Sequence, residues 1–258
     1  MAEVLGYIDG AQIVLYAFWV FFAGLVWYLQ AESRREGYPL EDDVSGSYNK
    51  DPVITLPSPK TFILPNGHGE RVYPHPENRD TREIKAKRAN VTSGSPLIPT
   101  GNPMKDGVGP AAWAERPDYP DAGLHGEPKI RPLSALDNFE IAKGDIDPVG
   151  QNVLTADSQI VGQISDVWVD TMENYIRFFE VKFGRNKRLI PLHFAKPQKA
   201  FRGGAPEYYV HALTAEQFRD IPKTKDADQI TMLEEEKIMG YFGGGMLYAT
   251  PDRAEPIL

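Results

Sequence analysis

The chain has 258 residues, 25% of them charged, and a formal net charge of −8. Phosphate binding by nucleic-acid-binding proteins requires a concentrated basic face, and no basic run occurs, so the composition argues against a nucleic-acid partner. The chain contains no cysteine, which excludes disulfides and thiolate metal sites and agrees with a reducing compartment.

The stretch from Ala11 to Leu29 contains no charged side chain. At about 1.5 Å per residue, its roughly 19 residues would span about 28 Å, close to the hydrocarbon thickness of a bilayer. Apolar residues occupy every face, which favours a transmembrane helix over residues 11–30 rather than a buried helix of a soluble domain. Aromatic residues at its two ends are typical of membrane interfaces: Tyr7, Tyr16, Trp27 and Tyr28.

Charge predicts the orientation of this helix. Glu3 and Asp9 precede it without any Lys or Arg, whereas Arg34 and Arg35 follow it directly. Basic residues stay on the cytoplasmic side, so residues 1–10 are expected to be periplasmic and the bulk of the chain cytoplasmic. A cleaved signal peptide would need a positive n-region, which is absent. Arg34 and Arg35 serve either as a stop-transfer signal, the favoured interpretation, or in specific lipid recognition.

Proline sets residues 31–132 apart from the remainder. Fifteen of the 22 prolines lie between Pro39 and Pro132. Each lacks a backbone donor and disfavours helix at the preceding residue, which excludes long helices and disfavours central strands. Large apolar residues such as Phe62, Ile63 and Trp113 nevertheless recur. We therefore expect a stiff, extended strap that covers the membrane-facing side of its own domain or of a partner.

Residues 133–258 are expected to form a mainly-β domain with a C-terminal helix. β-branched and aromatic residues predict strands at Ile160–Asp170, Tyr175–Phe183, Arg188–Phe194 and Glu207–Leu213, the first two joined as a hairpin by Thr171–Asn174. Short strands at this spacing indicate a small antiparallel barrel or curled sheet. Capping boxes predict a short helix after Thr214, with Gln217, and a longer helix Met232–Phe242 after Thr231, with Glu234, which Gly243–Gly245 would end.

No P-loop, GxGxxG, HExxH or GxSxG motif is present, and the five histidines are scattered. His68 and His75 are expected in solvated loops, and His193 and His211 within strands as structural residues. His125 lies in a loop with Asp121 and Glu127. An imidazole beside carboxylates exchanges protons near neutral pH and can hold a divalent ion weakly, although a solvated turn is the favoured interpretation.

Acidic residues also gather around the predicted hairpin. Asp166, Asp170 and Glu173 are expected to converge on one of its ends, where like charges raise one another's pKa. Groups with such pKa values transfer protons at physiological pH. From the residues alone, the favoured interpretation is that these acids are turn and edge residues that face water.

Several long phrases identify a family resemblance. They are Arg34–Leu40 (RREGYPL), Pro59–Pro65 (PKTFILP), Pro99–Pro110 (PTGNPMKDGVGP), Asp166–Asp170 (DVWVD) and Gly243–Ala249 (GGGMLYA). Together they closely resemble the H subunit of the purple-bacterial photosynthetic reaction centre, from the membrane helix nearly to the C-terminus. The hairpin region also resembles the PRC-barrel domain.

This resemblance implies a single transmembrane helix, a cytoplasmic PRC-barrel domain and a location in the bacterial inner (intracytoplasmic) membrane. It implies a non-enzymatic subunit that caps and stabilises the L and M subunits and helps to conduct protons to the secondary quinone. The chain itself would bind no cofactor; bacteriochlorophyll, bacteriopheophytin, quinones, carotenoid and non-haem iron would belong to partner chains. Further expected neighbours are the light-harvesting antenna, membrane lipids and a cytochrome on the opposite face.

The resemblance also assigns residues. Asp170 and Glu173 match acids of the proton path, His125 and Asp121 match groups where protons enter, and Arg177 matches a basic residue near the hairpin. Glu127 replaces a second histidine, which leaves His125 only a weak metal candidate, so no metal is expected. The set of His125, Asp121 and Glu127 could still gather protons. The membrane-interface residues are expected to be Trp27, Tyr28, Arg34, Arg35 and Lys60.

Two other functions compete with this one. A membrane-tethered adaptor, whose barrel binds another soluble partner, is distinguished by whether pigmented L and M chains co-purify with the protein. A membrane-anchored hydrolase has little support, because no pair of nucleophile and base can be named.

Overall fold

The computed structural model describes residues 9–48, 53–75, 80–198 and 206–254. Contacts divide the chain into two compact units. The first comprises Met1–Thr81 and Val91–Ser95, and the second comprises Arg82–Asn90 and Pro96–Leu258. The predictions made for Glu3, for Tyr7 and for the rest of residues 1–8 lie outside the described residues.

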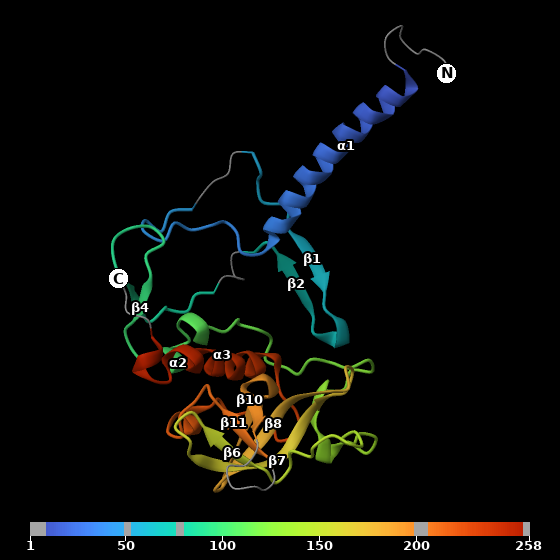
Figure 1. Cartoon of the computed structure of the whole chain (residues 1–258). Coiled ribbons are helices and arrows are strands. Elements are labelled where there is room, and N and C mark those ends of the chain that lie inside the picture. The colour runs from blue at the N-terminus through green and yellow to red at the C-terminus, as the bar shows by residue number, and fades with distance from the viewer. Residues whose placement is uncertain (1–8, 49–52, 76–79, 199–205, 255–258) are drawn as a thin grey trace. The chain divides into compact units, whose positions relative to one another are not determined.

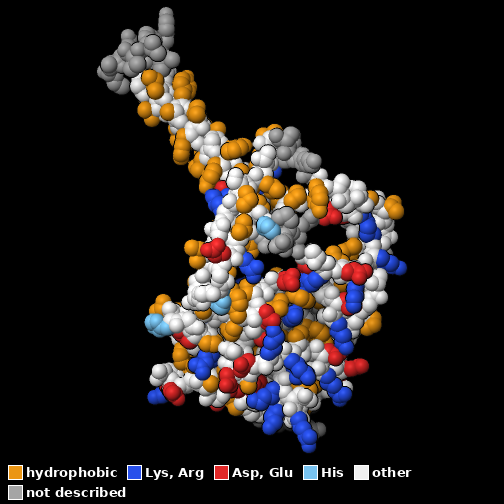
Figure 2. Space-filling view, turned by 180° about the vertical axis from the view of Figure 1, so that it is seen from behind, with side chains coloured by type: hydrophobic (Ala, Val, Ile, Leu, Met, Phe, Trp, Pro, Cys, Tyr) orange, Lys and Arg blue, Asp and Glu red, His pale blue; other side chains and the backbone are white. Residues whose placement is uncertain are grey.

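The first unit begins with the helix α1, Gly10–Glu32 (Figure 1). A capping box starts it: the carboxylate of Asp9 accepts a hydrogen bond from the backbone N–H of Gln12, and the Gln12 side chain accepts one from the N–H of Asp9. Hydrophobic side chains cover its surface (Figure 2), and it is long and apolar enough to cross a membrane. The apolar helix predicted over residues 11–30 is therefore confirmed.

A hairpin of two short strands lies in the same unit. The strand β1, Lys60–Ile63, pairs antiparallel with β2, Glu70–Tyr73. The ring of Phe62 packs edge to face on that of Tyr73, with centroids 6.2 Å apart. An isolated two-stranded hairpin is marginally stable in water, and the side chain of Ile63 remains 83% exposed. The hairpin therefore leaves apolar surface uncovered within its own unit.

The proline-rich segment forms only short elements. In the second unit, β3, Ala86–Arg88, pairs with β4, Leu97–Pro99, and the four-residue helix α2, Pro103–Asp106, starts after Asn102. The Asn102 side chain accepts hydrogen bonds from the N–H groups of Met104 and Lys105. Among the described residues between 36 and 132, no helix is longer than α2, as the proline content predicts.

A curled sheet of seven strands forms the body of the second unit. Its hydrogen-bonded order is β10-β11-β6-β7-β8-β9, with β5 beside the far half of β7. The pairing is antiparallel except between β11 and β6. This architecture confirms the predicted curled sheet. The strands are β5 Ile130–Pro132, β6 Asn152–Thr155, β7 Ile160–Asp170, β8 Tyr175–Phe183, β9 Asn186–Pro191, β10 Ala195–Gln198 and β11 Glu207–Val210.

The central hairpin β7–β8 has the predicted bounds, and Thr171–Asn174 forms its turn. Asn174 adopts a φ of 51°, in the left-handed region that Asn tolerates better than most residues. Register shifts interrupt the pairing twice, and the second shift leaves Arg177 between the pairs Trp168–Phe178 and Val169–Ile176. Such a bulge changes the direction in which the extra side chain points.

Two strands end earlier than predicted. The strand expected over Arg188–Phe194 ends at Pro191, after which Leu192–Phe194 forms a 3-10 turn, so His193 lies outside the strand. The strand expected over Glu207–Leu213 ends at Val210, so His211 also lies beyond it. The carbonyl of Leu213 instead accepts a hydrogen bond from the N–H of Ala156, a contact that local sequence does not reveal.

The helix α3, Met232–Tyr248, covers the core of the second unit. Ile238 and Phe242 are fully buried, and the ring of Phe242 lies 5.4 Å from that of Phe194. The predicted capping box is present, since the Thr231 hydroxyl accepts from the N–H of Glu234 and the Glu234 carboxylate accepts from the N–H of Thr231. The helix is therefore fixed at its start by its own sequence and along its length by the core.

The prediction that Gly243–Gly245 end this helix is wrong. The glycines instead allow other backbone segments to approach closely. A Cβ on Gly244 would lie 2.5 Å from the Cβ of Ala111, and one on Gly245 would overlap the carbonyl oxygen of Ala212. The helix continues through them because tertiary packing outweighs the low helix propensity of glycine.

We predict that Gly245→Ala destabilises the protein. Helix propensity alone favours alanine by about 1 kcal/mol. The added methyl group would meet a backbone oxygen that cannot rotate away, so the net loss in unfolding free energy is expected to be about 1 to 3 kcal/mol. The melting temperature of the full chain in detergent, followed by circular dichroism, measures it.

Met239→Ala provides the control, because Met239 lies on the same helix with an exposed side chain. Its effect is expected to stay within about 0.5 kcal/mol. A Gly245→Ala protein that melts at or above the temperature of the unmodified chain would contradict the proposed close approach.

Candidate functional site

Lys129 is the centre of a charged cluster at the turn end of the β7–β8 hairpin. Its Nζ lies 3.1 Å from a carboxylate oxygen of Asp170, 3.4 Å from one of Glu173 and 3.9 Å from one of Asp121. Burial opposes the charged form of Lys129, but Asp170 and Glu173 outweigh that effect and raise the pKa of the lysine above its ordinary value. Lys129 therefore stays protonated and holds three carboxylates around one cation.

Asp170 is the buried member of this cluster, with 1% of its side chain exposed. It is the last residue of β7 and pairs with Ile130 on one side and Tyr175 on the other. One carboxylate oxygen accepts hydrogen bonds from the N–H groups of Met172 and Glu173, and the other faces Lys129. Three charge-assisted contacts thus compensate a carboxylate that water does not reach.

Asp121 and Glu173 carry the cluster to the surface, since their side chains are 52% and 57% exposed. Backbone contacts hold them in place. The N–H of Lys129 donates to the carbonyl of Asp121, and both the N–H and the hydroxyl of Thr171 donate to the carbonyl of Lys129. The carboxylates that contact Lys129 therefore range from exposed, at Asp121 and Glu173, to buried, at Asp170.

Glu235 lies in the first turn of α3 and interacts electrostatically with Asp121 and Lys129 of the cluster. Its carboxylate is 3.8 Å from the guanidinium of Arg177, the bulge residue of β8. Burial raises the pKa of Glu235 to about 7; Asp121 adds to the rise, while Arg177, Arg116 and Lys129 oppose it. This carboxyl group therefore changes its protonation state close to neutral pH.

Packing of residues 117–121 against the start of α3 explains this burial. The carbonyls of Pro117 and Tyr119 accept hydrogen bonds from the N–H groups of Leu233 and Met232. These N–H groups have no partner within the helix. The segment therefore seals the helix terminus and brings Asp121 towards Glu235.

The loop that contains His125 is closed by its own backbone. Ala122 bridges to Pro128, the N–H of Gly123 donates to the carbonyl of Glu127, and the Glu127 carboxylate accepts from the N–H of His125. Glu127 thus contacts the backbone of His125, not its imidazole. Within the part of the chain that the structure describes, no three His, Asp or Glu side chains are grouped as metal ligands.

Asp166 does not belong to the cluster, and the prediction that it converges with Asp170 and Glu173 is wrong. Its carboxylate accepts hydrogen bonds from the hydroxyl of Ser134 at 2.5 Å and from the N–H of Val167. At about 3.3 Å per residue along a strand, it lies about 13 Å from Asp170. Membership of the same strand did not bring these acids together.

Sequence reasoning missed Lys129 and Glu235. A lysine next to a three-residue strand gives no local signal of its three acidic neighbours. The local sequence around Glu235 is that of an ordinary acid in a first helical turn, where the helix dipole favours negative charge. Its burial depends on residues 117–121, more than 100 positions away in the chain.

A second charged cluster lies in the first unit, at the end of α1. The carboxylate of Glu32 receives two hydrogen bonds of 2.8 Å from the guanidinium of Arg35 and lies 3.0 Å from the Nζ of Lys60. Arg35 also donates to the carbonyls of Ser58 and Tyr73. Arg35 therefore ties the helix end to the strap and to β2, and only 11% of its side chain is exposed.

The other predicted interface residues are more open. The guanidinium of Arg34 donates to the carbonyl of Ile54 and lies over the ring of Tyr38, 5.2 Å from its centroid. Trp27 and Tyr28 are about half exposed on α1, as interfacial aromatics would be. The structure thus places Arg34 and Arg35, at the start of the strap, in contact with its later residues, while Trp27 and Tyr28 face outwards.

We predict that Glu235 gives stability a pH dependence. Its pKa of about 7 lies above the ordinary value of 4.5, so the folded state binds the proton more tightly than the unfolded state. Unfolding free energy should therefore fall as pH rises from about 4.5 to 7, by an upper bound of about 3 kcal/mol. Glu235→Gln should remove this fall and gain stability relative to the unmodified chain at pH 8, measured by chemical unfolding at several pH values.

Glu216→Gln is the matched control, since Glu216 is exposed and outside the cluster. An infrared titration supplies an independent readout, in which a protonated carboxyl band present at pH 6 should be absent from the Glu235→Gln protein. If the unfolding free energies of the two variants depended on pH in the same way, a pKa of Glu235 raised by burial would be ruled out.

Two family models match this chain. The model described as "Photosynthetic reaction centre, H-chain N-terminal region" covers residues 2–135, which is more than half of the chain and includes α1, the strap and Lys129. The PRC-barrel domain model covers residues 143–203, which include the β7–β8 hairpin with Asp170 and Glu173. The chain therefore belongs to the photosynthetic reaction centre H-chain family, as a structural subunit of the reaction centre with a PRC-barrel domain.

Proposed function

We propose that this H chain caps the L and M subunits on the cytoplasmic side of the membrane and conducts protons towards the secondary quinone. The single observation that carries the proton-conducting role is the cluster around Lys129. The capping role rests on the uncovered apolar surface of the first unit. The chain itself binds no pigment, and the redox cofactors belong to its partners.

The composition of the cluster supports proton uptake. Four carboxyl groups, those of Asp121, Asp170, Glu173 and Glu235, face two cations, Lys129 and Arg177. With all groups ionised the cluster carries an excess of negative charge, which attracts protons from solution. Glu235 is partly protonated at neutral pH, so the cluster holds a proton that it can release.

The arrangement also gives the proton a direction. A proton first meets Asp121 or Glu173 at the surface, and Lys129 links both to the buried Asp170. When one carboxylate is neutralised, the lysine is free to move towards those that remain charged. Negative charge on a reduced quinone would raise the pKa of nearby carboxyl groups, so the arrival of an electron draws the proton inwards. His125 and Glu127 lie in the adjoining loop and would supply protons at its surface.

The proposed capping role accounts for the exposed apolar surface of the first unit. Val53, Leu56, Phe62 and Ile63 are exposed along the strap and the β1–β2 hairpin. Exposed apolar patches of this kind mark protein interaction sites, and a lone hairpin needs a partner to be stable. The hydrogen bonds of Arg35 to Ser58 and Tyr73 hold this part of the strap at the end of α1. We therefore place this surface beside the membrane-embedded L and M subunits. Lipids would lie at Trp27, Tyr28, Arg34 and Lys60.

We predict that Glu173→Gln slows the proton-coupled second electron transfer to the quinone by about tenfold. The substitution removes a titratable group 3.4 Å from Lys129 and keeps its shape. Flash kinetics on the purified complex measure this step. Primary charge separation needs no proton from this cluster and should be unchanged.

Glu216→Gln serves again as the control, because it removes an exposed acid elsewhere in the second unit. Its second electron transfer should match that of the unmodified complex. Unchanged kinetics in Glu173→Gln, within a complex that retains its pigments, would refute the proton-conducting role of this residue.

Membrane orientation can be tested with introduced cysteines, because the chain has none of its own. We predict that Glu3→Cys reacts with a membrane-impermeant maleimide only from the periplasmic side and Lys223→Cys only from the cytoplasmic side. Sealed vesicles of known and opposite sidedness give the two readings. Labelling of both positions from the same side would contradict a single crossing.

A further inference from the structure

A cavity of about 450 Å³ lies at the end of β8 and β9 that is remote from Asp170. It is lined by Phe183, Gly184, Asn186, Arg188 and Arg219. At about 3.3 Å per residue, β8 separates this end from the Lys129 cluster by roughly 26 Å. The cavity thus presents two arginines and no acidic side chain, in a chain whose net charge is −8.

Arg188 is the fixed cation of this cavity, and only 8% of the residue is exposed. Its Nε donates to the carbonyl of Ile221 at 2.9 Å, one terminal nitrogen donates to the carbonyl of Lys187 at 2.8 Å, and the other to that of Arg219 at 3.2 Å. A guanidinium has five N–H donors, so two remain. The guanidinium also lies 5.5 Å from the centroid of the Phe183 ring, which packs on Phe218.

The charge of Arg188 is only partly compensated. All three of its hydrogen-bond acceptors are neutral carbonyl groups. Burial lowers the pKa of Arg188, and the attraction of Asp220 opposes that effect without cancelling it. Asp220 itself forms an ion pair of 2.7 Å with Lys105. A buried cation in this position gains from an additional anion.

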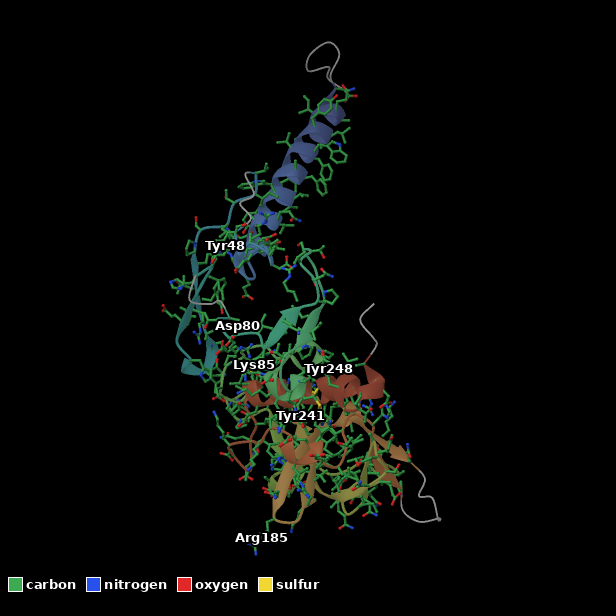
Figure 3. The ribbon with its side chains drawn as sticks, turned by 90° about the vertical axis from the view of Figure 1, so that its left-hand side faces the viewer. Tyr48, Asp80, Lys85, Arg185, Tyr241 and Tyr248 are labelled. Atoms are coloured by element: carbon green, nitrogen blue, oxygen red, sulfur yellow. The ribbon has the colours of Figure 1, made fainter. Side chains whose placement is uncertain are left out.

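Arg219 and Asn186 supply further donors. Within the described residues, no carboxylate pairs with the guanidinium of Arg219, and no hydrogen bond engages the side-chain amide of Asn186. Other basic residues lie around the same hairpin end, and Figure 2 shows Lys and Arg side chains gathered at the lower end of that face. Arg185 lies at the free tip and points away from the fold (Figure 3).

We propose that this cavity is a binding site for a phosphate group, held by Arg188, Arg219 and Asn186. The planar fork of a guanidinium binds phosphate oxygens in pairs, and two such groups match a doubly charged anion. Arg188 is already held in place, so little order is lost on binding. The negative charge of the whole chain has little influence here, because salt screens charges beyond about 8 Å.

The phosphate comes either free from solution or as part of a larger molecule such as a nucleotide. The cavity exceeds the size of a phosphate ion, and Phe183 gives it an aromatic wall. Inorganic phosphate and adenosine monophosphate therefore serve as separate probes. Tighter binding of the nucleotide indicates a larger ligand that uses the Phe183 wall, whereas equal affinity indicates recognition of the phosphate alone.

Titration of the purified full chain in detergent tests the proposal, with sodium chloride at matched ionic strength as the reference. Phosphate should raise the melting temperature above the chloride reference, as a ligand that binds only the folded state does. Arg219→Gln should weaken phosphate binding by about tenfold. Arg188→Gln is unsuitable, because it would also leave three carbonyls without their donor.

Arg185→Gln is the matched control, because it removes the same charge from the same hairpin end but does not line the cavity. Its affinity should stay within about twofold of that of the unmodified chain. Equal effects of phosphate and chloride, equal losses in Arg185→Gln and Arg219→Gln, or unaltered binding in Arg219→Gln would each overturn the proposal. If Arg219→Gln does not fold in chloride, Arg219→Lys decides in its place, since it keeps the charge and loses the fork.

Discussion

The ion pair between Asp170 and Lys129 is the interaction on which the hairpin end of the second unit depends. A carboxylate with 1% exposure is costly to bury unless its charge is compensated, and Lys129 together with two backbone N–H groups compensates it. The pair joins the end of β7, the turn that follows it and the residue before β5. The residues that stabilise this end of the hairpin are therefore also titratable residues of the Lys129 cluster.

A second constraint brings α3 to this cluster. Residues 117–121 seal the start of the helix, and the backbone around Ala111 fits against its glycines. These contacts bury Glu235 beside Arg177 and Asp121, which raises the pKa of Glu235 to about 7. The close packing of a glycine-rich helix thus has a chemical consequence at its N-terminal turn.

The two ends of the β8 strand have opposite electrostatic character. Near Tyr175 the acids outnumber the cations around Lys129, whereas near Phe183 two arginines line a cavity without an acid. A single rigid strand therefore separates a region that attracts protons from one that attracts anions. The first is the basis of the proposed proton path, and the second is a property of this fold that the family assignment does not address.

The sequence by itself determined the elements whose signals are local. The uncharged run of α1, the capping box at Thr231, the bounds of the β7–β8 hairpin and the lack of long helices among the prolines follow from short-range chemistry. Long phrases such as PTGNPMKDGVGP also carried the family resemblance, which in turn pointed to Asp170 and Glu173.

Tertiary structure decided the remainder. Gly243–Gly245 continue α3 because Ala111 and Ala212 need the space. The carboxylate of Asp166 accepts a hydrogen bond from Ser134 instead of joining the other acids. Lys129 and Glu235 reach the cluster only through contacts between distant segments. Burial and charge pairing depend on which distant residues meet, and a local pattern contains no record of that.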